Sequence, residues 1–437
     1  MGRMMKAFAL VAVALVSVVS GFSRTVIGAG SSPTALAIAG RSNATPSIAA
    51  NGNTVVVAWS ATLPTGGAAD VFAAVSRDGG RTFGAPSRVN DVDGDARVNG
   101  EQPPRVALRE SAITVVWTTK GANGTRLVQA SSADGGRTFT KAQPVPGADA
   151  AGNRGWENIA AGTAAAASGR TLAVWLDHRE LAQQDGQVAA SHHEHMNTAG
   201  SAAAGKPDGV AMAQKSKLYI ASLDGAVAPH AITGGVCYCC KTAIAIGADG
   251  AVYTAWRHVY PGNIRDIAFA ASRDGGRTFA PPVRVSEDKW VLEGCPDDGP
   301  AMALSGDGRI HIVWPTLVKE GEEDTIALFY SVSRDGKSFA PRQRIPAEGM
   351  PHHPQIAIGR DGTPMLAWDE SASGMRRAVA APVTTDGAGA ARLARVVLGD
   401  RAVYPVIAAA ADAAVVAWTA SAPGGSLVRV ATLTMKN

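Results

Sequence analysis

Four cysteines in two short stretches are the residues whose types and spacing most clearly predict chemistry. Cys237, Cys239 and Cys240 form a C-x-C-C string, and Cys295 follows in a later stretch. One interpretation is two disulfide bonds, for which four cysteines allow three connectivities. If Cys295 bonds to one of the three, a close pair remains, and a bond between Cys239 and Cys240 would be strained and easily reduced. The alternative is a thiolate metal site, because soft sulfur ligands favour copper(I) and, less strongly, zinc.

Histidines supply a second set of candidate metal ligands. His192, His193 and His195 lie in the string SHHEHM, and His352 and His353 follow a methionine. A polar, histidine-rich loop is equally compatible with a plain solvated segment. Together with the cysteines, these histidines predict a copper or zinc site, since imidazole and thiolate both bind these ions.

A turn motif that recurs four times indicates how the chain positions these residues. It appears as Ser76–Phe83 (SRDGGRTF), Ser132–Phe139 (SADGGRTF), Ser272–Phe279 (SRDGGRTF) and the shorter Ser333–Phe339 (SRDGKSF). In each copy the aspartate can accept hydrogen bonds from backbone N–H groups, and glycine supplies positive φ. We expect the phenylalanine to pack back onto the preceding sheet.

A second repeat consists of short β-branched runs that end in tryptophan. Most copies lie about 50 to 60 residues apart, which suits one four-stranded propeller blade with its loops. Such continuous apolar runs are typical of strands buried on both faces. The tryptophans are Trp59, Trp117, Trp175, Trp256, Trp314, Trp368 and Trp418.

These repeats predict an all-β fold, a β-propeller with seven four-stranded blades. The last unit has only about three strands of its own. We predict that Pro33–Ala39 supplies its missing outer strand and closes the ring, because an unpaired sheet edge is a liability. Six blades is the alternative, if one tryptophan run is only the edge of a blade.

The N-terminus is typical of a secretory signal peptide, which we assign to residues 1–29. Arg3 and Lys6 precede an apolar run, Phe8–Val19, that is short for a membrane span. An uncleaved anchor is the alternative, and no later stretch is apolar enough to span a membrane. We therefore predict one domain, residues 30–437, in the periplasm or outside the cell, where cysteines can be oxidised.

Composition and charge narrow the range of partners. The 437 residues carry a net charge of +4, from 41 basic and 37 acidic residues that are spread along the chain. This pattern does not predict nucleic-acid binding, and we expect a monomer. In a propeller, loops converge on one face around the axis, and the cysteines and most histidines fall in those loops. We expect a small-molecule, glycan or metal ligand there.

The repeated turn is similar to the Asp-box, or BNR repeat, of the sialidase-like β-propeller family. The resemblance covers almost the whole mature chain and implies the fold. It says little about activity, because Asp-boxes lie away from the active face and also occur in proteins that are not enzymes. Catalytic sialidases of this family have six blades.

The resemblance also implies catalytic residues, which this sequence matches only in part. Sialidases bind the substrate carboxylate with three arginines, the first in an R-I-P motif, and use a tyrosine nucleophile activated by glutamate. The only R-I-P string here, Arg344–Pro346, falls on an expected outer strand. The candidates on the expected face are Arg154, Arg179, Arg257 and Arg401 for the carboxylate, Tyr404 as nucleophile, Glu293 or Glu157 as its activator, and Asp91 or Asp93 as the acid.

Three functional hypotheses follow from these patterns. The first is a ligand- or metal-binding propeller that uses the face bearing Cys, His and Met and is not a working sialidase. The second is an exo-acting sialidase or related glycoside hydrolase with a diverged arginine cluster. The third is an interaction scaffold whose cysteines are structural.

Overall fold

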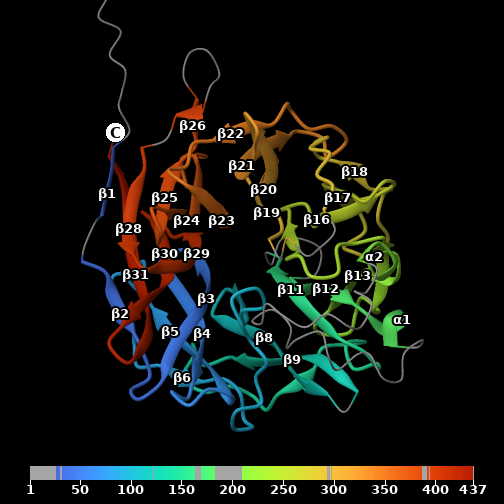
Figure 1. Ribbon diagram of the computed structural model, residues 1–437. Helices are drawn as coiled ribbons and strands as arrows, with labels where there is room; N and C mark the ends of the chain where they lie inside the picture. Colours follow the sequence, from blue (N-terminus) through green and yellow to red (C-terminus); the bar gives the residue numbers. More distant parts are fainter. Residues whose placement is uncertain are drawn as a thin grey trace, which may run out of the picture.

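The chain forms a closed ring of seven antiparallel blades. The computed structural model describes residues 26–29, 32–121, 123–162, 169–182, 209–292, 296, 298–385, 391–392 and 394–436. Within these residues the sheets are arranged as blades around a central axis (Figure 1). The inner strand of each blade contacts that of the next, and the last contacts the first. The prediction of an all-β, seven-bladed propeller is confirmed, and the six-bladed alternative is wrong.

The blades share one strand order, from the axis outward. The inner strands are β3 (Ser42–Asn51), β7 (Arg105–Arg109), β11 (Arg154–Ala161), β15 (Ala243–Ile246), β19 (Ala301–Leu304), β23 (Met350–Ile358) and β29 (Ala402–Ala409). The second strands are β4 (Thr54–Thr62), β8 (Ala112–Gly121), β12 (Thr171–Asp177), β16 (Val252–Tyr260), β20 (Ile310–Glu320), β24 (Pro364–Ala372) and β30 (Ala414–Ala422). The third strands are β5 (Ala69–Ser76), β9 (Gly124–Ser132), β13 (Lys217–Ser222), β17 (Ile264–Ser272), β21 (Glu323–Ser333), β25 (Met375–Pro382) and β31 (Gly425–Lys436). The outer strands are β6 (Ser87–Arg88), β10 (Gln143–Pro144), β14 (His230–Gly234), β18 (Val283–Arg284), β22 (Gln343–Ile345), β28 (Val396–Asp400) and β2 (Thr34–Leu36).

The N-terminal part of the chain closes the ring as predicted. Strand β2 pairs antiparallel with β31, with Thr34 opposite Val430. Strand β1 (Val26–Ala29) pairs with the end of the same strand, and Figure 1 shows β1 and β2 beside β31. The outer edge of the last blade is therefore covered by the first strands of the chain. Of the predicted signal peptide, residues 1–25 lie outside the described residues.

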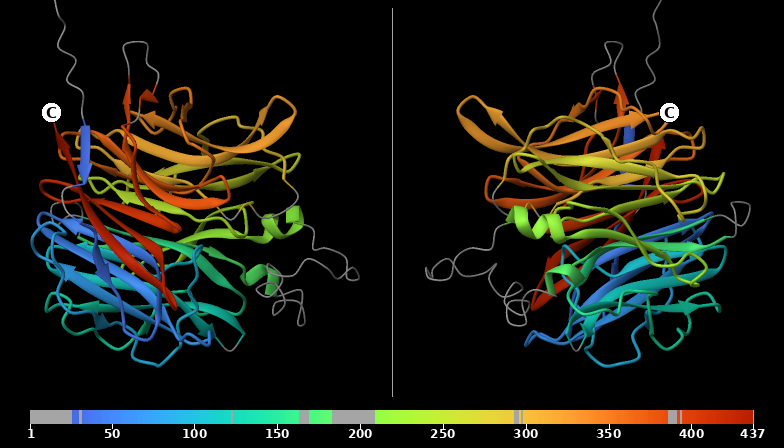
Figure 2. Two further views of the ribbon diagram at one scale, coloured as in Figure 1. Left: turned by 60° about the vertical axis from the view of Figure 1, so that its left-hand side comes forward. Right: turned by 90° about the vertical axis from the view of Figure 1, so that its right-hand side faces the viewer.

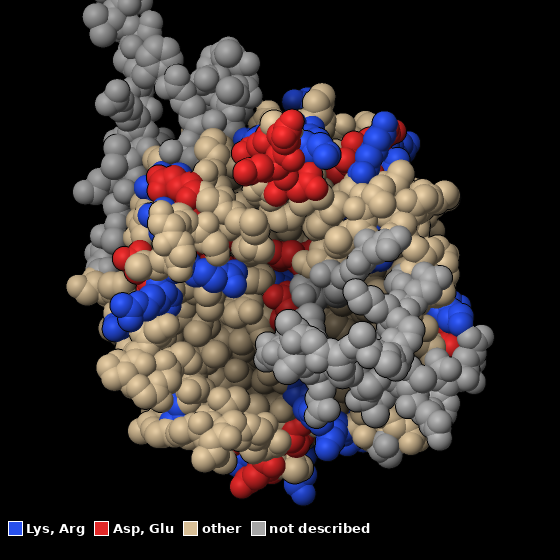
Figure 3. All heavy atoms as spheres, viewed as in Figure 1, with Lys and Arg blue, Asp and Glu red and all other residues tan. Residues whose placement is uncertain are grey.

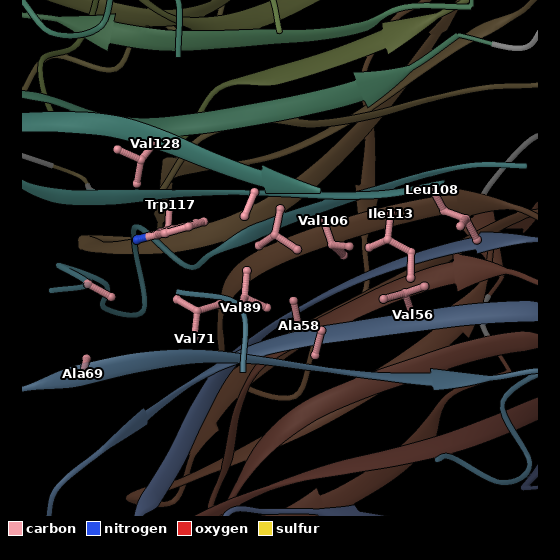
Figure 4. Close-up of a cluster of buried hydrophobic side chains, with 14 residues drawn as sticks. Val56, Ala58, Ala69, Val71, Val89, Val106, Leu108, Ile113, Trp117 and Val128 are labelled. Atoms are coloured by element: carbon pink, nitrogen blue, oxygen red, sulfur yellow. The ribbon is translucent and has the colours of Figure 1, made fainter. Parts of the chain in front are cut away.

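The apolar core lies between neighbouring blades. The tryptophan of each second strand is almost completely buried, with 2% exposure or less. Between the first two blades, Trp117 packs with Val71, Val89 and Val128 in one cluster (Figure 4). Burying a large apolar side chain contributes about 1.5 to 3 kcal/mol. The tryptophan repeat therefore supplies each blade interface with a comparable anchor.

The repeated turn has the hydrogen bonding that its sequence predicts. Asp274 accepts bonds from the backbone N–H groups of Arg277 and Thr278, both at 2.9 Å, and from the Thr278 hydroxyl at 2.6 Å. Ser272 donates to Asp274 at 2.7 Å and accepts the N–H of Gly276 at 2.8 Å. The same pattern recurs at Asp78 and Asp134. The phenylalanines that end the turns, Phe83, Phe139, Phe279 and Phe339, pack against blade cores.

A few short elements lie outside the blades. Helices α1 (Arg179–Ala182) and α2 (Gly209–Lys215) lie on the face of the ring that points toward the viewer in Figure 1, as the side views of Figure 2 show. Strands β26 (Thr384–Thr385) and β27 (Ala391–Arg392) form a small hairpin after β25. Neither helix, nor any other in the described ranges, is long and apolar enough to cross a membrane.

Candidate functional site

Four inner strands begin with the same backbone irregularity. A non-glycine residue has positive φ in each, at Thr45 (54°), Trp156 (52°), His353 (52°) and Tyr404 (53°). At each position the pairing with the second strand shifts register, which is a β-bulge. Such conformations cost about 1 to 3 kcal/mol each and cluster at functional sites. The bulges therefore mark the end of the propeller axis where a site is expected.

A small, open hollow lies at that end of the axis. The bulge residues Thr45, His353 and Tyr404 line it, together with Arg105 and Lys241 from other blades. Figure 3 shows acidic side chains gathered at the centre of this face. The Tyr404 ring packs against Gly100, where any side chain would collide with it, because a Cβ at this position would lie 1.9 Å from the ring.

A buried lysine joins two carboxylates beneath the hollow. The Lys241 ammonium lies 3.1 Å from a Glu101 oxygen and 3.6 Å from an Asp298 oxygen. Burial opposes its charge, but these two carboxylates outweigh that effect and raise the pKa of Lys241. Burial likewise opposes the charge on both carboxylates, but Lys241 and His353 lower the pKa of each. At neutral pH all three groups are therefore charged.

His353 is the second cation of this cluster. Its Nε2 lies 2.9 Å from Glu101, its Nδ1 lies 2.5 Å from Asp369, and its backbone N–H donates to Asp298 at 2.7 Å. Burial and the nearby Lys241 oppose protonation of the imidazole, but Asp298 and Asp369 outweigh them and raise its pKa to about 9. The imidazolium therefore donates to two carboxylates at once. Its ring also packs on Tyr404, with ring centroids 4.3 Å apart.

The carboxylates of this cluster could hold a metal ion by geometry alone. Ligand atoms of Glu101, Asp298 and His353 all lie within 4.8 Å of one another. The protonated His353 and the Lys241 ammonium already neutralise these carboxylates, however, and an imidazolium has no free lone pair for a metal. The cluster is therefore better described as an ion network that holds the hollow's floor in place.

Two side chains present hydrogen-bonding groups to the hollow that no described residue engages. Arg105 donates from Nε to the carbonyl of Glu157 at 2.9 Å, and its terminal nitrogens have no hydrogen bond or ion pair to a described residue. The Tyr404 hydroxyl also has no hydrogen-bond partner within the described ranges. Burial and the nearby Glu101 carboxylate raise the pKa of Tyr404, so the hydroxyl remains a donor.

Glu157 lies behind Arg105 and does not fully neutralise it. Its side chain is 1% exposed, and Thr118 donates to one carboxyl oxygen at 3.3 Å. The other oxygen is buried without a hydrogen-bond partner in the described structure. Burial raises the pKa of Glu157 to about 7. The carboxylate beside Tyr404 is Glu101, so Glu157, one of the two activators predicted for Tyr404, does not occupy that position.

The four predicted arginines do not meet in the hollow. Arg154 and Arg179 both pair with the buried Asp177, at 3.2 and 2.7 Å. Arg257 donates to three backbone carbonyls and stacks on a tryptophan ring. Arg401 is exposed to solvent at the start of β29. The first three support the blade structure. Among the described residues, the arginine that lines the hollow is Arg105, which the sequence motifs did not indicate.

Of the other predicted site residues, some lie at the hollow, some lie away from it, and some lie outside the described residues. Tyr404 lines the hollow, as does His353, and His352 lies 3.8 Å from the same Asp298. Asp91 and Asp93 lie on an exposed loop and do not line it. The predicted residues Glu293, Cys295, His192, His193 and His195 lie outside the described residues.

The three described cysteines form a buried cluster beside the hollow. The sulfur of Cys240 lies 2.7 Å from that of Cys237, and the Cys239 sulfur lies 3.9 Å from Cys237. Cys237 and Cys240 are not disulfide-bonded, whereas Cys239 is. Burial opposes the Cys237 thiolate, but the Cys240 thiol, Arg265 and Arg257 outweigh burial and lower the pKa of Cys237 to about 6. The cysteines and the pair His352 and His353 are held in separate clusters, not in one shared site.

Sequence reasoning missed most of the ion network. Glu101 and Arg105 lie where the chain enters the second blade, Asp298 lies where it enters the fifth, and Asp369 lies on β24. No local motif links them, because the ring alone brings them together. One usable signal exists in the sequence. Three of the four bulge residues, Thr45, His353 and Tyr404, are each followed by proline at the start of an inner strand.

Comparison with known proteins identifies the fold. A scan against models of protein families finds no match, and no curated protein matches the sequence. Three solved structures cover most of the chain. A protein of unknown function from Dyadobacter fermentans is 13% identical, over 94% of this chain and 99% of its own, with a TM-score of 0.51. The GH93 alpha-L-arabinofuranosidase of Fusarium graminearum, in complex with arabinobiose, is 11% identical over 93% and 98%, with a TM-score of 0.50.

The third structure is the Hadza microbial sialidase Hz136, which is 13% identical over 84% of this chain and 74% of its own, with a TM-score of 0.45. The TM-scores of 0.51 and 0.50 for the first two structures indicate a common fold, and identities of 11 to 13% leave the activity open. The chain is thus similar in fold to propellers that include glycoside hydrolases. Its function has to be inferred from the residues of its own site.

Proposed function

We propose that this protein is a ligand-binding propeller whose axial hollow binds a small organic carboxylate. The observation that carries the proposal is Arg105, whose guanidinium lines the hollow with its terminal nitrogens unpaired among described residues. A buried guanidinium without an ion-pair partner is costly, and a carboxylate is the planar anion that matches its two parallel N–H groups. The ligand's anion would complete a site that the protein leaves open.

The charge balance of the surrounding cluster supports this assignment. Lys241, the protonated His353 and the ion-paired Arg376 face the carboxylates of Glu101, Asp298 and Asp369. These charges compensate one another, which leaves the positive charge of Arg105 for the ligand. The Tyr404 hydroxyl supplies a further donor for a ligand oxygen. Pro46, Pro103 and Pro405 also line the hollow and give it apolar walls.

Titration calorimetry with matched sugars tests the proposal. Glucuronate and glucose differ in carrying a carboxylate or a hydroxymethyl group, and N-acetylneuraminate serves as a larger sugar acid. We expect a carboxylated sugar to bind and glucose to bind at least about tenfold more weakly. Replacing Arg105 by methionine should weaken carboxylate binding by about tenfold to hundredfold, because a hydrogen bond to a charged group contributes about 1.5 to 3 kcal/mol.

Two control variants make this result specific. Arg105→Lys keeps the charge but loses the two-pronged geometry, so its affinity should fall between wild type and Arg105→Met. Arg401→Met removes an exposed arginine near the same face and should leave affinity unchanged. Equal affinity for glucuronate and glucose, or wild-type affinity in a folded Arg105→Met protein, would contradict the proposal.

A second candidate function is an exo-acting glycoside hydrolase of sialidase type. The observation that favours it is the position of Tyr404, the predicted nucleophile, whose hydroxyl lines the hollow beside the Glu101 carboxylate. A glutamate next to a tyrosine can accept its proton during nucleophilic attack. Against it, the described residues that line the hollow include one arginine, where the sialidase pattern requires three.

A fluorogenic sialoside tests this second candidate. If the protein is a sialidase, it releases the fluorophore, and both Tyr404→Phe and Glu101→Gln reduce the rate by at least about a hundredfold, as expected for loss of a nucleophile or its base. A neutral arabinofuranoside is the matched substrate without a carboxylate. A folded wild-type protein that binds the sugar acid but releases no fluorophore is a binding protein and not a sialidase.

A further inference from the structure

Cys237 and Cys240 have the spacing and geometry of a reacting pair. They are the ends of a C-x-x-C string in the segment that leads into the inner strand β15. Their sulfurs lie 2.7 Å apart, and the side chains are 1% and 2% exposed. A modest approach of these sulfurs would give the bonding distance of about 2.05 Å. This pair differs from the adjacent pair, Cys239 and Cys240, that the sequence suggested.

The surroundings of Cys237 favour its thiolate over a metal complex. Arg265 donates from Nη1 to the Cys237 sulfur at 3.3 Å, and the positive charge of the buried Arg257 is near enough to stabilise the thiolate. Two fixed cations stabilise a negative sulfur, which makes it the nucleophile of a thiol pair. The same two cations repel a metal cation, which would have to bind within the field of both guanidinium groups.

We propose that Cys237 and Cys240 are a redox pair that is converted from dithiol to disulfide by a small disulfide such as oxidised glutathione. The Cys237 thiolate attacks one sulfur of the oxidant, breaks its S–S bond and releases one thiolate. A mixed disulfide on Cys237 results. Cys240 then loses its proton and attacks the Cys237 sulfur, which releases the second thiolate. Two electrons pass to the oxidant. The Cys240 proton ends on one released thiolate, and the other released thiolate takes a proton from solvent, because Cys237 reacts as a thiolate.

The redox pair is connected to the axial hollow through one peptide bond. Lys241, the buried cation of the ion network, directly follows Cys240. The segment is held from both sides, since Thr242 donates to the Trp156 carbonyl at 2.8 Å and Gly299 packs against the Lys241 backbone. A disulfide would fix Cys240 and with it the start of Lys241. This consequence, unlike the redox pair itself, rests on the proposed function of the hollow.

Thiol trapping in redox buffers tests the pair directly. The full-length protein is equilibrated with mixtures of reduced and oxidised glutathione, quenched in acid, unfolded and alkylated, so that buried thiols are also counted. Mass spectrometry of the peptide that spans residues 237–240 is the readout. We expect Cys237 and Cys240 to be alkylated together in reducing mixtures and to lose alkylation together in oxidising ones. Cys239→Ser should preserve this joint behaviour.

Two single variants distinguish the cysteine that attacks the oxidant from the cysteine that resolves the mixed disulfide. Cys240→Ser should trap a glutathione adduct on Cys237, because no second thiol remains to release it. Cys237→Ser should carry at least about tenfold less adduct on Cys240, because it removes the sulfur that Arg265 contacts. Where a variant fails to fold, the wild-type titration alone decides the proposal.

Three outcomes would overturn the redox pair. They are full alkylation of both thiols in every mixture, independent loss of the two thiols, and stoichiometric copper or zinc that protects the cysteines from alkylation. Binding of glucuronate is then compared between the oxidised and reduced protein, with an expected difference in affinity of at least about threefold. If the two cysteines are oxidised together and the affinity does not change, the redox-pair proposal is supported and only its connection to the hollow is rejected.

Discussion

Replacing Lys241 by methionine is expected to lower the free energy of unfolding by about 3 to 5 kcal/mol, the usual cost of removing one partner from a buried ion pair. The Lys241 side chain is 8% exposed and lies between Glu101 and Asp298. Without it, the two carboxylates face each other across the floor of the hollow. Urea unfolding at pH 7, followed by tryptophan fluorescence and circular dichroism, measures the change.

Two further variants show whether the loss arises from unpaired charge. In Lys241→Met, two carboxylates lose their lysine partner. Adding Glu101→Gln removes one of these two negative charges, so the double variant should be more stable than Lys241→Met alone. Lys217→Met is the matched control, because Lys217 pairs with Glu180 in a partly exposed position. That change should cost less than about 1 kcal/mol. If Lys241→Met is no more destabilising than Lys217→Met, the ion network does not support the hollow.

The stability of the protein is expected to fall as pH rises from about 6.5 to about 9 because of His353. Its pKa is about 9 in the folded protein, against 6.5 for an ordinary histidine. A raised pKa means that the folded state binds the proton more tightly. The contribution is therefore complete below pH 6.5 and is lost as pH rises through 9. The difference amounts to roughly 3 kcal/mol.

Comparison of His353→Gln with wild type isolates this effect. Urea unfolding is measured at several pH values between 6 and 9.5, and the difference in unfolding free energy between the two proteins should shrink as pH rises. His230→Gln is the control, because the His230 ring nitrogen contacts only a backbone carbonyl, at 2.9 Å, among described residues. That variant should keep the wild-type slope. A difference between His353→Gln and wild type that is constant with pH would mean that His353 is not the proton-binding group.

The local repeats in the sequence were sufficient to predict the architecture. A blade is held together by contacts within about 60 residues of chain, so each blade leaves its own pattern in the sequence. The tryptophan strands gave the number of blades, and the missing strand of the last unit predicted closure by Pro33–Ala39. The turn motif also works locally, because the hydrogen bonds of its serine and aspartate join residues at most four positions apart.

The candidate site was only partly readable from the sequence. Tyr404 and His353 were found because their residue types stand out in loops expected on one face. The arginines were not placed correctly, since the sequence does not show that Asp177 pairs with both Arg154 and Arg179. Cys237 and Cys240 were singled out as disulfide or metal-ligand candidates, but their sulfur–sulfur contact and the nearby Arg265 appear only in three dimensions.

The sequence alone therefore determined the all-β ring and its repeated turns, because both depend on contacts between residues that are close in the chain. What only the tertiary structure decided is the ion network at the axis. His353 and Glu101 are separated by 252 residues along the chain, and closure of the ring brings them within 2.9 Å. Their charges depend on burial and on one another, so neither residue's state can be inferred before its neighbours are known.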